Sequence, residues 1–141
     1  SCVNDAGYFA DFTRTFSMGT PTEEQLTVYE TVKAAQSAGT TIAKSNIPAK
    51  AIDKEVREII EKAGYGEYFV HRTGHGLGIE VHEAPWINNL NSAKVRPGMV
   101  FTIEPGIYLP GNFGVRIEDD IVLTSSGNEN FTPVTHDLVQ I

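Results

Sequence analysis

The chain has 141 residues, 40% of them hydrophobic, which is the size and composition of one ordinary domain with its own core. Its 11 basic and 18 acidic residues give a net charge of −7, and the basic residues form no run, so nucleic acid is not expected as a partner. No apolar stretch reaches the ~18 residues that a membrane span needs, so no membrane partner is expected either.

The beginning of the chain predicts a β-hairpin. Residues 4–7 (NDAG) are typical of a turn, and residues 8–15 (YFADFTRT) are rich in aromatic and β-branched types. The first strand of this hairpin is expected mostly or wholly before Ser1, and the absence of an initial methionine predicts a processed or engineered fragment. Cys2, the only cysteine, is expected to be a packing residue, and a single cysteine favours a reducing, cytoplasmic location.

Two helices should follow. Thr20, Pro21 and Glu23 form a capping box with proline at the first helical position, and apolar residues continue at 26, 29 and 32. A second helix is indicated by apolar residues at 52, 56, 59, 60 and 63, with Gly64 as its C-terminal cap. Beyond Tyr65 the sequence changes to short extended pieces separated by Gly, Pro and Asn. This pattern predicts one α+β domain over residues 1–141, with a largely antiparallel sheet.

Three of the four histidines lie in residues 71–83, HRTGHGLGIEVHE, beside three glycines. Glycine lets backbone and ligand approach closely, because no Cβ stands in the way. One strand–turn–strand excursion could therefore bring His71, His75 and His82 to a single cleft. The fourth histidine, His136, has no such companions and is expected to be a packing or surface residue.

Several carboxylates stand at the ends of predicted strands. Glu104, in TIEPGIY, follows an apolar run and precedes a Pro-Gly turn, so it should face a cleft. Arg116 and Glu118 are two residues apart and share one face of a strand. If that face is buried, its charges need a compensating cation, but an edge strand with one face in water explains the alternation equally well. The same two interpretations apply to Asp11.

Together, Asp11, His75, Glu104 and Glu118 offer three carboxylates and one imidazole. An oxygen-rich set with a single nitrogen suits Mn²⁺, Co²⁺, Fe²⁺ or Zn²⁺. Carboxylates can also bridge two such ions, as in two-metal hydrolases. The four residues therefore predict a divalent metal site.

Four segments in order, ADFTRTF, HRTGHGLGIEVHE, FTIEPGIY and GVRIEDD, resemble the pita-bread metallopeptidases, a family that includes methionine aminopeptidase, aminopeptidase P and Xaa-Pro dipeptidase (prolidase). The second and fourth segments are most similar to the aminopeptidase P and prolidase branch. The resemblance implies a pita-bread fold, with a mostly antiparallel curved sheet flanked by helices. It also implies that the first strand or strands and the usual N-terminal domain of the family are missing.

The resemblance implies a dinuclear centre in the intact enzyme, with Asp11 and Glu118 as bridging ligands and His75 and Glu104 completing the set of one metal. The family has a further aspartate about eleven residues before the position of Asp11, which falls just before Ser1. Asp5 is the only nearby acid, but its turn sequence argues against a ligand role. Residues 1–141 alone are therefore expected to hold one ion well and the second weakly, and to lack activity as a fragment.

The family also implies catalytic roles. His71 and His82, one of them protonated, would hydrogen-bond the substrate and the developing oxyanion, and Glu104 would move the proton of the attacking water to the leaving nitrogen. Tyr108 and Arg116 would bind substrate.

The implied reaction is metal-dependent hydrolysis of X-Pro bonds in small peptides, with a homodimer as one expected assembly. Three alternatives stay open: a methionine aminopeptidase, a metal-free creatinase-like hydrolase, and a catalytically silent pita-bread binding module. Retention of all four metal-ligand candidates argues against the last two. Dipeptidase and aminopeptidase P are not separated by the sequence.

Overall fold

The computed structural model describes all residues from Ser1 to Ile141. Its central sheet has five strands in the order β10-β9-β6-β4-β5, and every pairing in it is antiparallel. The strands are β4 (Gly74–Gly76), β5 (Glu83–Ile87), β6 (Val100–Ile103), β9 (Asp119–Leu123) and β10 (Asn128–Asn130). The predicted α+β class with a largely antiparallel sheet is confirmed.

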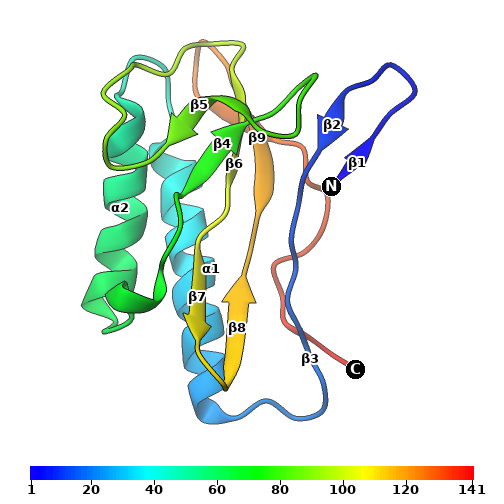
Figure 1. Ribbon diagram of the computed structural model, residues 1–141, viewed down its shortest axis with the longest axis vertical. Coiled ribbons are helices and arrows are strands. Elements are labelled where there is room, and N and C mark those ends of the chain that lie inside the picture. The colour runs from blue at the N-terminus through cyan, green and yellow to red at the C-terminus, as the bar shows by residue number, and fades with distance from the viewer.

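Two helices, α1 (Glu23–Ile42) and α2 (Ala49–Lys62), run side by side along the long axis of the molecule and pack on the strands (Figure 1). The buried core lies between helices and strands in two clusters: one joins α1 and α2 to Ile107, Val115 and Ile117, and the other joins the helices to Phe101 and Ile121. A short 3₁₀ helix, η1 (Gly66–Tyr68), follows α2. Neither long helix is apolar enough to cross a membrane.

The cap of α1 differs from the prediction. Thr22, not Thr20, is the N-cap: its hydroxyl accepts the Gln25 N–H at 3.2 Å, and the Gln25 side chain accepts the Thr22 N–H at 2.8 Å. Pro21 therefore precedes the cap, and Glu23 begins the helix. The same Thr-x-x-Glu/Gln spacing occurs two residues further along, so the sequence offered two overlapping capping boxes. The predicted end of α2 is confirmed, with Gly64 at a φ of 87° directly after it.

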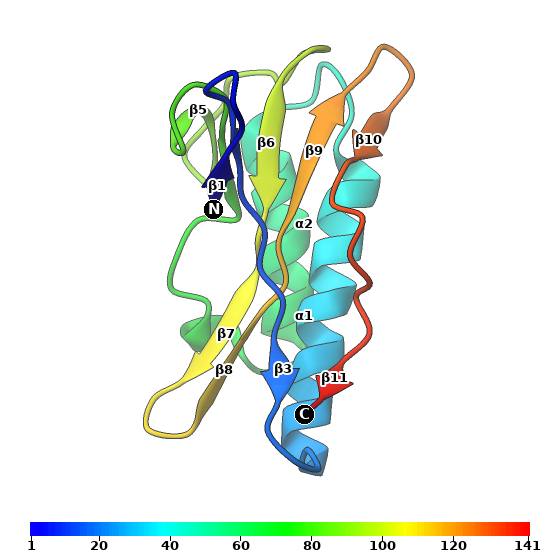
Figure 2. The same ribbon diagram turned by 90° about the vertical axis from the view of Figure 1, so that its right-hand side faces the viewer.

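Two further strands form a separate two-stranded sheet below the central one. In Figure 2, β6 leads into β7 (Gly106–Leu109), and β8 (Phe113–Arg116) leads into β9. The β7–β8 pair is antiparallel, with Gly106 opposite Arg116, while the β6–β9 ladder ends with Ile103 opposite Asp119. The two ladders are therefore separated by a break, and Glu104 and Glu118 lie in it.

The first part of the chain runs along this ribbon (Figure 2). β1 (Cys2–Val3) pairs antiparallel with β2 (Phe9–Ala10) through the predicted turn, so the hairpin has a short first strand within the chain. Thr13 then forms an isolated bridge with Glu118. Finally β3 (Phe16–Ser17) pairs in parallel with β11 (Val139–Gln140), the one parallel pairing. This path of the chain places Asp11 beside the break between the two ladders.

Candidate metal centre and adjoining cleft

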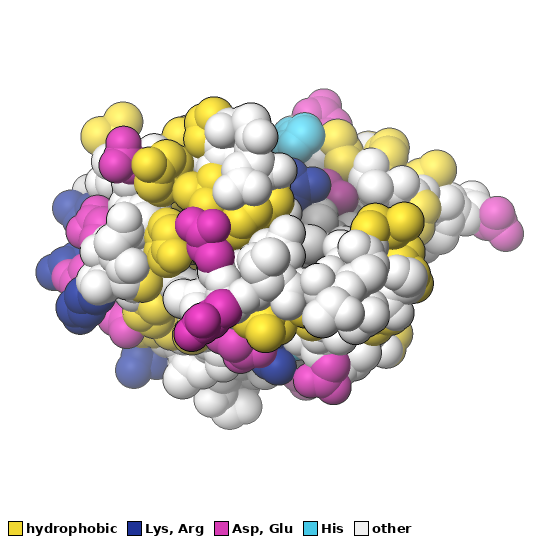
Figure 3. Space-filling model, turned by 90° about the horizontal axis from the view of Figure 1, so that it is seen from below, with side chains coloured by type: hydrophobic (Ala, Val, Ile, Leu, Met, Phe, Trp, Pro, Cys, Tyr) yellow, Lys and Arg dark blue, Asp and Glu magenta, His cyan; other side chains and the backbone are white.

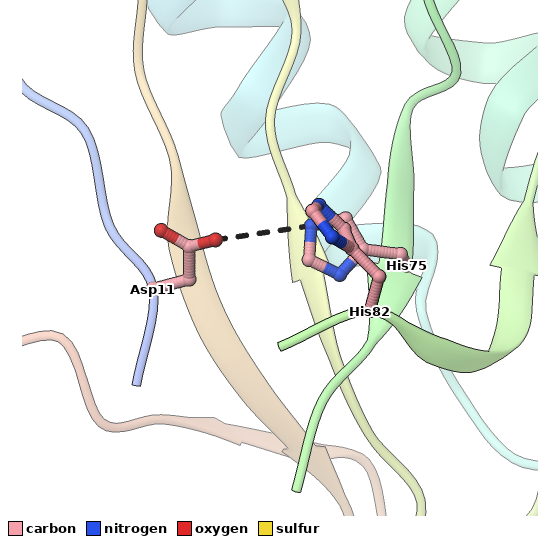
Figure 4. Close-up of side chains that lie close together, drawn as sticks. All are labelled: Asp11, His75 and His82. Carbon is pink, nitrogen blue, oxygen red and sulfur yellow. Dashed lines mark ion pairs between the residues drawn. The ribbon is translucent and has the colours of Figure 1, made fainter. Parts of the chain in front are cut away.

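The four predicted metal ligands come together at the break. His75 Nε2 lies 3.3 Å from Glu104 Oε1 and 3.9 Å from Asp11 Oδ2. Ligand atoms of His75, Glu104 and Glu118 all lie within 4.8 Å of one another, as do those of Asp11, His75 and His82. Figure 4 shows Asp11 pointing at the two imidazoles from the other side of the site.

Strand β4 holds His75 in place because its glycines let it sit close to both neighbouring strands. A Cβ on Gly74 would lie 1.9 Å from the Thr102 carbonyl oxygen, and one on Gly76 would lie 2.2 Å from the Ala84 carbonyl oxygen. The His75 ring donates from Nδ1 to the Gly76 carbonyl at 3.1 Å. Nε2 of the neutral ring then carries a lone pair directed at the carboxylates, which is the arrangement that a metal-binding histidine needs.

The carboxylates repel one another. Burial, followed by the charge of Glu118, raises the pKa of Glu104 from 4.5 to about 7. The positive charges of Arg116 and Arg72 lower this pKa but do not cancel the rise. Burial is also the main cause that raises the pKa of Glu118, to which Asp11 adds, while the hydroxyl of Thr13 donates to Glu118 and opposes the rise. The edge-strand interpretation is therefore wrong for Glu118, which is 2% exposed.

Asp120 provides a second sign of uncompensated charge. Its Oδ2 accepts the Asp11 N–H at 2.9 Å, but its buried Oδ1 has no hydrogen-bond partner. Burial is the main cause that raises its pKa to about 6, with contributions from Asp11 and Glu118. A divalent cation among these groups would relieve the repulsion, so the residues present fit a metal ion.

An open cleft of about 600 Å³ adjoins the centre. It is lined entirely by polar side chains: His71, Arg72, His82, Asn88, Glu104 and Arg116. The predicted catalytic and substrate-binding residues His71, His82, Glu104 and Arg116 thus meet in one place. The roles of these side chains stay predictions.

His71 is held at both nitrogens. Nδ1 donates to the Arg72 carbonyl at 2.8 Å, and Nε2 lies 3.0 Å from the hydroxyl of Tyr108, which brings the fifth predicted residue to the cleft. Burial lowers the pKa of His71 below its usual 6.5. The lowered pKa favours the neutral ring at pH 7, and the role of His71 as a donor to the oxyanion stays a prediction. His82 is exposed, and its ring lies 4.2 Å from that of His75.

Another cavity, of about 360 Å³, lies between β3, α1 and the β7–β8 hairpin and is lined by Phe16, Met18, Pro21, Tyr29 and Phe113 among others. It contains no histidine or carboxylate. Figure 3 views the molecule from this lower end, where apolar side chains are exposed among acidic ones. This cavity lacks the histidines and carboxylates that the predicted chemistry needs, whereas the polar cleft has both.

The residues that hold the site in place were not predicted from the sequence. Asp119 is fully buried and accepts hydrogen bonds from four side chains, at 2.6 to 2.8 Å: Arg14, Gln36, Asn130 and His136. Arg14 also donates to the carbonyls of Thr13 and Glu118. His136 is thus a structural partner of a buried acid, in line with its expected packing role. The pair of adjacent aspartates after Glu118 was the one sequence signal for this network.

The curved antiparallel sheet, its covering helices and the acid-rich centre at its break define the class of pita-bread metallopeptidases. Residues 1–125 match the model of metallopeptidase family M24. The chain belongs to this family, which depends on a dinuclear metal centre.

Relatives and solved structures agree with the predicted branch. The chain is 50% identical over 132 residues to a Xaa-Pro dipeptidase of Lactobacillus helveticus, covering 94% of this chain and 36% of the relative. A prolidase structure from Thermococcus sibiricus has a TM-score of 0.94 at 52% identity, covering 96% of this chain and 37% of the other. For an X-Pro aminopeptidase from Thermotoga maritima the TM-score is 0.93 at 44% identity, covering 96% and 38%. The chain therefore spans less than two fifths of the length of these relatives.

Proposed function

We propose that the whole protein containing this chain hydrolyses X-Pro bonds in small peptides, as a Xaa-Pro dipeptidase or aminopeptidase P. The observation that carries the proposal is the convergence of Asp11, His75, Glu104 and Glu118 beside a cleft lined by His71, His82 and Arg116. The names of similar proteins from Lactobacillus helveticus and Thermococcus sibiricus support the substrate class.

In this proposal Asp11 and Glu118 would be shared between two divalent ions, and His75 and Glu104 would complete the ligand set of one of them. The oxygen-rich set with one imidazole suits Mn²⁺, Co²⁺, Fe²⁺ or Zn²⁺. When bound, the metal lowers the pKa of water and polarises the scissile carbonyl. Residues 1–141 alone supply four ligands to one ion and two to the other, so calorimetric titration of this chain with Mn²⁺ should give one tight site. Two tight sites would contradict that assignment.

The protein's own groups move the proton and hold the substrate. Glu104, fixed by the hydroxyl of Thr102 at 3.3 Å, accepts the proton of the attacking water and passes it to the proline nitrogen. His82, the exposed histidine of the cleft, donates to the developing oxyanion. Arg116 uses Nε to donate to Thr13 at 3.0 Å, and its remaining N–H groups bind substrate together with Tyr108.

The peptide preference follows from proline itself. An X-Pro bond has no N–H, so it cannot pair with the backbone groove of an ordinary protease. A cleft lined by polar side chains is compatible with this bond.

We also propose a cytoplasmic location, because a single exposed cysteine fits a reducing compartment. Analytical ultracentrifugation of the whole protein would test the expected homodimer.

The test compares Ala-Pro, a longer X-Pro peptide and a Met-initiated peptide as substrates of the whole protein, after chelation and after readdition of Mn²⁺. Metal-dependent cleavage of the X-Pro bond alone is expected. Preference for the Met-initiated peptide would indicate a methionine aminopeptidase. Cleavage that survives chelation would indicate metal-free chemistry, and no cleavage under any condition would indicate a binding module.

A further inference from the structure

Asp53 on α2 is a fully buried acid that the proposed chemistry does not use. Both of its oxygens are occupied: Oδ2 accepts the Nε–H of Arg57 at 2.8 Å, and Oδ1 accepts the hydroxyl of Thr73 at 2.8 Å. An ion pair between residues i and i+4 of a helix usually lies on the surface and contributes little to stability. This pair is different, because its acid is 0% exposed and is shared with a residue outside the helix.

Beyond Asp53, the guanidinium of Arg57 reaches the segment between η1 and β4. One terminal N–H group donates to the carbonyl of Phe69 at 3.1 Å, and the other donates to the carbonyl of His71. The guanidinium carbon also lies 4.3 Å from the centre of the Phe69 ring. Residues 69–73 belong to no helix or strand, so the planar fork of one side chain holds carbonyls that no strand ladder holds there.

These contacts fix His71 at one wall of the cleft. The rings of Phe69 and His71 meet edge to face, with centroids 5.0 Å apart and planes at 86°. His71 is therefore held by Arg57 at its carbonyl and by Phe69 at its ring. On the remaining side, Nε2 of His71 lies 3.0 Å from the hydroxyl of Tyr108. A small shift of the segment would move the imidazole away from this partner.

The other end of the segment is held by Asp53. Thr73, whose hydroxyl donates to Asp53, accepts the Glu104 N–H with its carbonyl at 2.8 Å. We propose that Asp53 and Arg57 are positioning residues of the X-Pro reaction, which act through residues 69–73 to hold His71 in the cleft. Neither side chain of the pair lines the cleft, so both act at a distance from the substrate. This inference rests on the proposed X-Pro hydrolysis and deepens it.

A double-mutant cycle in the whole protein tests the inference, with kcat and KM for Ala-Pro measured per folded, metal-loaded molecule. The variants are Arg57→Gln, His71→Ala and the two combined. Because Arg57 is proposed to act through His71, Arg57→Gln should lower kcat/KM by about 10- to 100-fold in wild type, but by less than about threefold in His71→Ala. Arg57→Lys keeps the charge without the planar fork and should show a smaller loss. Lys54→Gln, at an exposed position of the same helix, should match wild type.

The ring nitrogens of His71 give a readout that a loss of stability alone does not move. In ¹⁵N NMR spectra of the folded protein with chelator at pH 8, His71 should carry its proton on Nδ1, which donates to the Arg72 carbonyl. In Arg57→Lys the signals of both ring nitrogens of His71 should shift. Those of His136, which is held by Asp119, should stay in place.

Equal losses for Arg57→Gln in wild type and in His71→Ala would mean that Arg57 only stabilises the fold, and would overturn the inference. Full activity in Arg57→Gln or in His71→Ala, or unshifted His71 signals in Arg57→Lys, would overturn it too, while leaving X-Pro hydrolysis in place. If Arg57→Gln does not fold, the same cycle with Arg57→Lys decides: a loss that is equal in both backgrounds, or absent, overturns the inference. Failure of the wild type to cleave Ala-Pro with metal present would refute the proposed function and this inference together.

Discussion

Metal affinity at the candidate centre should rise between pH 6 and pH 8, and one carboxyl group should account for most of the rise. Burial, followed by the charge of Glu118, raises the pKa of Glu104 to about 7. In the metal-free protein at pH 6 this group is mostly protonated. A cation must then displace the proton in order to bind, so its apparent affinity falls as the pH falls.

The size of the effect follows from the pKa. For a ligand group that titrates near 7, the competition by protons decreases about tenfold between pH 6 and pH 8, whereas an ordinary glutamate would give almost no change. His75 adds little over this range, because burial lowers its pKa below 6.5. The raised pKa of Glu118, for which burial is the main cause, acts in the same direction as that of Glu104.

Calorimetric titration with Mn²⁺ at pH 6, 7 and 8 would measure the affinity. Two buffers of different ionisation enthalpy would count the protons released. Glu104→Gln should bind more weakly and lose most of the pH dependence and of the proton release near pH 6. Glu129→Gln, at an exposed position of β10, should behave as wild type. A wild-type affinity that is flat from pH 6 to 8, or an unchanged slope in Glu104→Gln, would refute the reasoning.

Three further outcomes are expected. Glu118→Ala should abolish X-Pro cleavage by the whole protein, because Glu118 is buried against Asp11 and His75, while Glu129→Ala should change the steady-state rate less than about twofold. Gly74→Ala should lower the free energy of unfolding by about 1–3 kcal/mol or more, because its Cβ meets a backbone carbonyl of β6, whereas Gly127→Ala, with open space around it, should be near neutral in denaturant melts. With a chelator present, the free energy of unfolding should fall by up to about 3 kcal/mol as the pH rises from 4.5 to about 7. The reason is that the folded protein binds the proton of Glu104 more tightly than the unfolded chain does. Denaturant melts of wild type and Glu104→Gln across that pH range would check the sign.

Features encoded over a few residues were predictable from the sequence. The apolar spacing of α2 and its terminal Gly64 rest on local geometry, and both are confirmed. The glycines around His75 marked a close approach of backbones, which the structure shows as contacts of β4 with β5 and β6. The convergence of the ligand candidates was a hypothesis from residue chemistry and family resemblance, because spacing alone cannot place residues 11 and 118 together.

Features that depend on tertiary contacts were not predictable. Asp119 looks like one more surface acid in the sequence, yet it collects donors from α1 and from the C-terminal segment. Arg72 does not stand out in the sequence, and only the structure places it in the same cleft as Glu104. The choice of Thr22 over Thr20 as N-cap was a choice between two equivalent local patterns. The hydrogen-bond partners of Asp119 are distant from it in the sequence, and the two capping patterns of α1 are equivalent at the level of the sequence.

The gathering of like charges at the break is held by backbone pairing. Glu104 donates its N–H to the Thr73 carbonyl at 2.8 Å, which ties it to the segment of His71 and His75. Glu118 exchanges N–H and carbonyl with Thr13, which ties it to the segment of Asp11. Because each acid is anchored through its backbone to a different neighbouring segment, the backbone keeps the carboxylates near one another although they repel. Repulsion is then expressed in raised pKa values, and a divalent cation can relieve it without rearranging the chain.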